Sequence, residues 1–180
     1  MPLANFAPGE AQTNPDVLQA IIQAGEQFSI VASQDIVDIR GLKLWAKGRP
    51  VSGALQQRLL ERRLLHPQEA CLMAEDGVTP FTLLAQYTAL LEKDDTLARA
   101  LHPSAALLQD QLKKMPLHAV AQLMLTTAWA TRPETLPHAV EAMALAGAIA
   151  HAQSTPVDMR LAMLGGLLHD IGETYIQPEY

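Results

Sequence analysis

The chain has 180 residues, of which 49% are hydrophobic and 18% charged, and its formal net charge is −6. This composition is typical of a globular protein with a sizeable core and excludes a disordered chain. No run of Lys and Arg is longer than Arg62–Arg63 or Lys113–Lys114, so a nucleic-acid polymer is not expected as a partner.

Neither a signal peptide nor a membrane-spanning segment is predicted. The N-terminus lacks a basic start and an apolar core, and the most apolar window, residues 117–130, is too short to cross about 30 Å of hydrocarbon. The single cysteine, Cys71, leaves no internal disulfide and fits a reducing compartment. We therefore predict a soluble, cytoplasmic protein with no membrane partner.

The first part of the chain mixes a helix with short strands. Residues 1–13 are polar and predict a loose arm, and Asn14–Pro15 is a helix start, with a capping side chain before proline. From Phe28 to Val51 short β-branched runs alternate with Gly and Pro turn signals, which predicts a small β-hairpin over about residues 28–51.

Everything after Ser52 has the pattern of helices. Their start signals are Ser52, Thr79–Pro80 and Thr155–Pro156, and Pro103 divides residues 101–112 into two short helices. The last helix has the expected apolar stripe Val157, Leu161, Leu164 and Leu168. The fold class predicted is mainly α. We divide it into an N-terminal module, residues 1–115 with the hairpin, and the first portion of a second helical domain, residues 116–180.

A candidate metal site lies near the C-terminus. His169 and Asp170 are adjacent at the end of an apolar run, and His138 lies upstream on the preceding predicted helix. Two imidazoles and a carboxylate suit a divalent metal that activates water. The alanine-rich helix around His138, together with Gly165 and Gly166, would allow the two helices to approach closely and leave space for an ion.

Two simpler interpretations accompany this one. The glycines fit simple close packing of helices about equally well, and His169 fits a histidine at a helix C-terminus with Gly172 as the C-cap. Glu134, one helical turn before His138, is a further candidate ligand, although an exposed first-turn glutamate is the simpler interpretation. His151 follows His138 on the same predicted helix but lies about 220° around it, and is expected to point elsewhere.

His138-Ala139-Val140-Glu141, followed by Leu167-Leu168-His169-Asp170-Ile171-Gly172, resembles the opening of the HD superfamily of metal-dependent phosphohydrolases. The resemblance covers about residues 133–180 and is closest to the HD-GYP branch, the bacterial cyclic di-GMP phosphodiesterases. It implies an all-α core in which His138, His169 and Asp170 are metal ligands and Asp170 is catalytic, with Glu134 matching an additional ligand of some members. It also implies two or three iron- or manganese-type ions, a bridging hydroxide that attacks the phosphodiester, and a cyclic dinucleotide or other phosphoester as substrate.

The chain departs from the family pattern in two ways. The substrate-binding lysine that the family usually has three residues after the aspartate is replaced by Glu173, which brings negative charge to an anion-binding position. The later histidines, the closing aspartate and the GYP segment would lie beyond Tyr180. Metal binding is therefore expected to be weak or absent in these 180 residues.

These observations lead to two interpretations of the function of the chain. The first is the N-terminal part of a longer HD-type phosphodiesterase, inactive alone. The alternative is a non-catalytic helical regulatory or interaction module with a degenerate HD motif, whose exposed apolar helices would favour a homo-oligomer.

Overall fold

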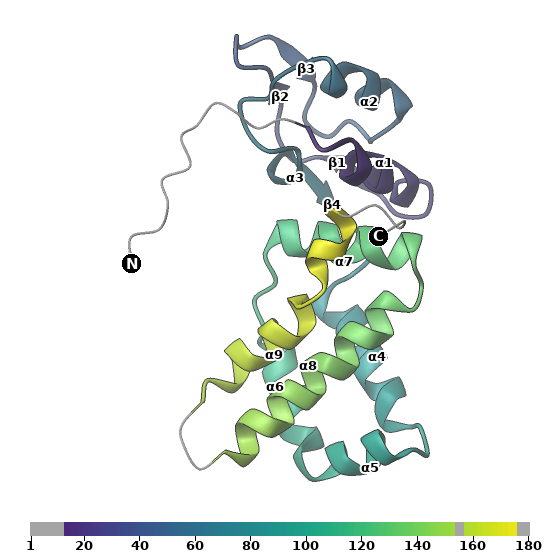
Figure 1. The fold of residues 1–180 in the computed structure, drawn as a ribbon, viewed down its shortest axis with the longest axis vertical. Helices are drawn as coiled ribbons and strands as arrows, with labels where there is room; N and C mark the ends of the chain where they lie inside the picture. Colours follow the sequence, from purple (N-terminus) through teal and green to yellow (C-terminus); the bar gives the residue numbers. More distant parts are fainter. Residues whose placement is uncertain (1–12, 154–156, 176–180) are drawn as a thin grey trace.

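The computed structural model describes residues 13–153 and 157–175, and it is mainly α-helical with two small sheets (Figure 1). The predicted fold class is confirmed. Most of the predicted N-terminal arm (residues 1–12) and the predicted cap Thr155–Pro156 lie outside the described residues. Among the described residues, no helix combines the length and apolarity that crossing a membrane requires.

The N-terminal elements form one end of the molecule (Figure 1). They are α1 (Pro15–Ala24), β1 (Ile30–Ala32), β2 (Ile36–Val37), β3 (Lys43–Trp45), α2 (Gly53–Leu60), α3 (Gln68–Cys71) and β4 (Leu72–Ala74). The predicted cap of the first helix is present, because the Asn14 side chain accepts hydrogen bonds from the amides of Asp16 and Val17 at 3.0 and 3.2 Å.

The predicted hairpin is present as β2 and β3, which pair antiparallel with Ile36 opposite Trp45. β1, in contrast, pairs antiparallel with β4, with Val31 opposite Met73. The prediction that the chain is helical throughout after Ser52 is therefore wrong for β4. So short an apolar strand has too little alternation to be told from a helix by its period, and its pairing with a distant strand decides its structure.

The remaining elements are helical and form the other end of the molecule (Figure 1). They are α4 (Pro80–Leu91), α5 (Thr96–Leu101), the 3₁₀ helix η1 (His102–Ser104), α6 (Ala105–Lys113), α7 (Ala119–Thr131), α8 (Thr135–Ala152), α9 (Met159–Leu168) and the 3₁₀ helix η2 (Ile171–Tyr175). The predicted break at Pro103 is confirmed, since η1 separates α5 from α6.

Two hydrophobic clusters make up the core, and α7 contributes to both. Leu123 and Met124 belong to a cluster with α1, α2 and the strands, whereas Leu125 belongs to a cluster with α4, α6, α8 and α9. All residues from Leu123 to Ala128 are buried, as expected of a helix covered on every side. The domain boundary near residue 115 stays a prediction.

Candidate metal centre

The site is positioned by the close packing of α8 against α9. A Cβ atom on Gly166 would lie 2.6 Å from the carbonyl oxygen of Ala142, so only glycine allows the two backbones to approach this closely. Gly165 has open space instead, with nothing within 4 Å of the corresponding position. Of the two glycines, one is thus a packing residue and the other borders solvent.

This contact also fixes the rotation of α9. The helix buries Met163 and Leu167, on the same side as Gly166. Leu161 and Val157 are exposed, at 68% and 49%. The predicted stripe is therefore confirmed at Leu164 and Leu168, which are partly buried and pack against the second cluster, and wrong at Val157 and Leu161. The helix begins at Met159, with Asp158 as its N-cap. The close contact of Gly166 with α8 decides which side of α9 is buried, although Leu161 has the larger apolar surface.

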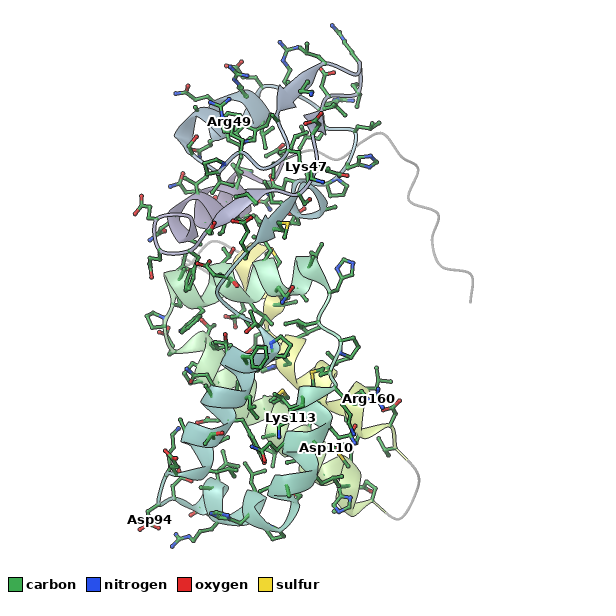
Figure 2. All side chains as sticks on the ribbon, turned by 180° about the vertical axis from the view of Figure 1, so that it is seen from behind. Lys47, Arg49, Asp94, Asp110, Lys113 and Arg160 are labelled. Atoms are coloured by element: carbon green, nitrogen blue, oxygen red, sulfur yellow. The ribbon has the colours of Figure 1, made fainter. Side chains whose placement is uncertain are left out.

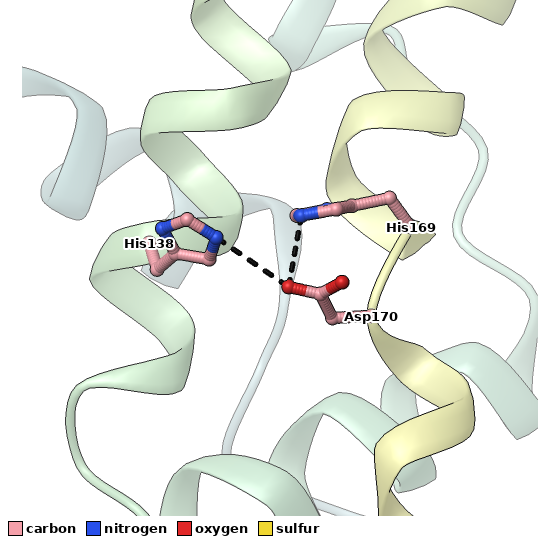
Figure 3. Close-up of side chains that lie close together, drawn as sticks. All are labelled: His138, His169 and Asp170. Atoms are coloured by element: carbon pink, nitrogen blue, oxygen red, sulfur yellow. Dashed lines mark ion pairs between the residues drawn. The ribbon is translucent and has the colours of Figure 1, made fainter.

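The three residues predicted as metal ligands lie together (Figure 3). Asp170 Oδ2 lies 2.8 Å from His169 Nε2 and 3.4 Å from His138 Nε2. Donor atoms of all three residues lie within 4.8 Å of one another. Two ligands that are each about 2.1 Å from one ion are roughly 3–3.5 Å apart, so the two distances from Asp170 are close to those expected for a shared metal ion.

A backbone hydrogen bond orients the His169 ring. Its Nδ1–H donates to the carbonyl oxygen of Gly166 at 2.8 Å, which leaves Nε2 as the nitrogen that faces Asp170. In a neutral imidazole with this tautomer, Nε2 is a lone-pair acceptor, and so is the carboxylate oxygen. Two acceptors at this distance repel unless a cation, either a proton or a metal ion, lies with them. A carbonyl partner for the second ring nitrogen is also the usual arrangement for a metal-binding histidine.

The donor atoms are open to solvent. The side chain of His138 is 60% exposed, and those of His169 and Asp170 are 39% exposed. Water therefore competes for the ion and weakens its electrostatic attraction to the carboxylate. The chemistry of the donor set fits a divalent metal, whereas its exposure fits weak binding.

The other two candidate residues lie at the edges of this group. Glu134 is the N-cap residue of α8 and is exposed, and its carboxylate is not among the grouped donor atoms, so its role as a ligand stays a prediction. Glu173, in η2, forms an ion pair with Arg132 at 2.9 Å. Sequence reasoning missed Arg132, because nothing in the sequence pairs two residues so far apart along the chain. The ion pair offsets the negative charge at the position where the family usually has lysine.

The interpretation of His169 as a simple helix end is met only in part. His169 is the C-cap residue of α9, but Gly172 does not adopt the left-handed conformation of a capping glycine. The chain instead continues into η2, with the amide of Glu173 donating to the carbonyl of Asp170 at 2.9 Å. The backbone turn after Asp170 is thus hydrogen-bonded.

Two other reactive side chains lie away from the centre. His151 is exposed and is not among the grouped donor atoms, as predicted. Cys71 is buried, and burial raises the pKa of its thiol, with a smaller opposing effect from a hydrogen bond donated by Gln34. A thiol of this kind is a poor nucleophile.

Comparison with known proteins agrees with this geometry. The family model of the HD domain matches residues 135–179, about a quarter of the chain, and this segment contains all three grouped side chains. The match supports the HD superfamily, whose members are generally metal-dependent phosphohydrolases, for this segment. No curated protein and no solved structure matches the chain.

Proposed function

We propose that this chain carries one part of the metal centre of an HD-type phosphohydrolase. His138, His169 and Asp170 would hold one divalent ion of the iron or manganese type. The observation that carries the proposal is the convergence of three donor atoms from two segments that are distant in the sequence, with the second nitrogen of His169 held by Gly166. A metal there would supply Lewis-acid chemistry, polarising a phosphoryl oxygen and activating water.

At a finer level, we propose that the complete protein is an HD-GYP-type phosphodiesterase that hydrolyses cyclic di-GMP. It would act in the cytoplasm and would hold two or three metal ions. This assignment is supported by the resemblance of residues 133–180 to that branch. Three protein ligands suffice for one ion, and they leave Asp170 as the single carboxylate among them. A second ion needs further ligands, and none is grouped with these three among the described residues, which supports an inactive chain.

A non-catalytic interaction module is the second candidate, and the exposed face of α8 and α9 favours it. Leu145 and Ile149 follow His138 by about two and about three helical turns, hence on the same face of α8. They are 45% and 51% exposed, and Leu161 of α9 is 68% exposed. Apolar side chains on both helices would favour association with another helix, including one from a second copy.

Metal analysis separates the two candidates. Purified chain titrated with Mn²⁺ and followed by electron paramagnetic resonance is expected to bind about one ion. His169→Ala is expected to weaken binding by a factor of ten or more, because ligand loss should cost at least as much as the loss of an outer hydrogen bond. His151→Ala is the matched control, an exposed histidine of the same helix pair. Equal Mn²⁺ binding by all three proteins, or none by any, would contradict the metal centre and favour the interaction module.

Activity is the second readout. The 180-residue chain, loaded with Mn²⁺ or Fe²⁺, is expected to show negligible hydrolysis of cyclic di-GMP, since its ligand set is exposed and holds a single carboxylate. Product formation would be followed by liquid chromatography, with metal-free chain as the control. Robust metal-dependent turnover by the purified chain would show that the three residues suffice for catalysis. It would contradict the proposal that the chain carries only one part of the metal centre.

A further inference from the structure

Cationic side chains gather at the N-terminal end of this acidic molecule. Seven of the 13 Lys and Arg residues lie between Asp38 and Arg63, and Asp38 and Glu61 are the acidic residues of that segment. This segment therefore has a formal charge of +5, while the rest of the chain carries −11. All seven cationic side chains are exposed, whereas Asp38 is buried. Figure 2 shows Lys47 and Arg49 at this end, far from Lys113 and Arg160 on the helices.

Folding brings these cations together from separate segments. Residues 37–39 lie antiparallel to residues 63–65, since the amide of Ile39 donates to the carbonyl of Arg63 and the amide of Leu65 donates to that of Val37, both at 3.1 Å. Asp38 and Leu64, which are paired, both point inward. Because side chains alternate along strands, Ile39, Arg63 and Leu65 share the outward face.

Exposed aliphatic side chains are interleaved with the cations on this face. Ile39, Leu42 and Leu65 are 46%, 53% and 37% exposed. Arg40 and Leu42 lie in the turn between β2 and β3, a turn held by Asp38, whose Oδ1 accepts from the amides of both residues at 2.9 Å. We call the surface formed by Ile39, Arg40, Leu42, Arg63 and Leu65 the hairpin face.

The arginines of the hairpin face differ from their cationic neighbours in their ion pairing. Among the described residues Arg40 and Arg63 form no ion pair, whereas the neighbouring Arg62 lies 3.7 Å from Asp38 and Lys43 is paired with Asp35. An exposed guanidinium beside exposed aliphatic carbon is suited to a partner whose interior is apolar and whose surface is anionic. We propose that the hairpin face binds the surface of an anionic lipid bilayer.

Three observations favour a bilayer over other partners. The hairpin lies at the end of the molecule that is remote from helices α4, α5, α6, α8 and α9, so a plane can reach it without touching those helices (Figure 1). The −11 charge of the remainder is repelled by the same surface, which fixes the orientation. The aromatic side chain of this region, Trp45, is buried, so the face offers no ring on which nucleic-acid bases could stack. Surface binding of this kind requires no membrane-spanning helix, so the proposal revises the prediction of no membrane partner, which rested on the lack of a spanning segment.

The test is co-sedimentation of the full chain with phosphatidylcholine vesicles, with and without phosphatidylglycerol, at low and high salt. Binding is expected only with phosphatidylglycerol and is expected to weaken at high salt. The double variant Arg40→Gln, Arg63→Gln is expected to bind roughly thirty-fold more weakly, about fivefold for each arginine. Ile39→Ser, Leu42→Ser is expected to reduce binding roughly tenfold, because less apolar surface is buried.

Matched controls come from the helical end of the molecule. Lys113→Gln, Lys114→Gln removes the same charge from the last residue and the C-cap of α6, and Leu161→Ser removes an exposed leucine from α9. Both variants are expected to bind as the parent chain does. Failure of the parent chain to sediment, or equal losses in variants and controls, would overturn the proposal. Tight binding to single-stranded RNA that survives Ile39→Ser, Leu42→Ser would also overturn it, by assigning the face to a polyanion. Neither result would affect the metal-centre proposal, which Mn²⁺ binding tests independently.

Discussion

Gly166→Ala is expected to lower the free energy of unfolding by about 1–3 kcal/mol and to weaken metal binding together with it. The added Cβ would lie 2.6 Å from the carbonyl oxygen and 2.8 Å from the carbonyl carbon of Ala142, and a backbone cannot rotate aside as a flexible side chain can. The helices must therefore move apart. His138 is on α8, while His169 and Asp170 follow the end of α9, so their donor atoms must separate too.

Gly165→Ala is the matched control and is expected to act in the opposite direction. Gly165 is the neighbouring residue in the same helix, but nothing lies within 4 Å of its Cβ position. Alanine there should stabilise the chain by about 0.5–1 kcal/mol, because it lowers the entropy of the unfolded chain and favours helix. Urea unfolding gives the stabilities and Mn²⁺ titration gives the affinities. If both variants behaved alike, the role of Gly166 in setting the helix approach would be refuted.

Thr126→Val is expected to destabilise the chain by about 1–3 kcal/mol. The Thr126 hydroxyl accepts a hydrogen bond from the amide of Val78 at 3.0 Å, and both residues are buried. Valine has nearly the same shape but no acceptor, so it would leave the Val78 N–H buried without a partner. This hydrogen bond links α7 to the segment between β4 and α4. Its loss should therefore weaken the packing where the two core clusters meet.

Thr127→Val is its control, one residue along the same helix. The Thr127 side chain is also fully buried, but its hydroxyl has no hydrogen-bond partner among the described residues. Replacing it by a methyl group removes a polar atom buried without compensation, so stability is expected to rise or stay unchanged. Thermal unfolding followed by circular dichroism measures both variants. A larger loss for Thr127→Val than for Thr126→Val would contradict the assigned hydrogen bonds.

The sequence predicted best those features that depend on neighbouring residues. Asn14 and Thr79 both accept hydrogen bonds from the first turns of α1 and α4, because capping is a local property of a few adjacent residues. The grouping of His138 with His169 and Asp170 was also predictable. Small residues on both helices allow close approach, and helical spacing then limits which side chains can meet.

Features that depend on distant partners were not predictable in the same way. The pairing of β1 with β4 joins segments that are far apart in the sequence, and so short an apolar run carries no signal of strand geometry. The apolar stripe of the last helix was predicted correctly at Leu164 and Leu168 but wrongly at Leu161, because hydrophobicity alone favours leucine over Gly166 as a residue of the helix contact. The ion pair of Arg132 with Glu173 likewise arises from the tertiary fold.

The residue directly after Asp170 has a consequence for the whole molecule. Ile171 is partly buried and packs against both hydrophobic clusters, and η2 contacts α1 as well as α7. A shift of the N-terminal elements relative to α7 would therefore change the packing of Ile171. Because Asp170 directly precedes Ile171, the position of its carboxylate would change too. Because such coupling is reciprocal, a metal ion bound at Asp170 would change the equilibrium position of the N-terminal elements by the same coupling free energy. A change at one end of the molecule would then be transmitted to the other end, as a sensor requires.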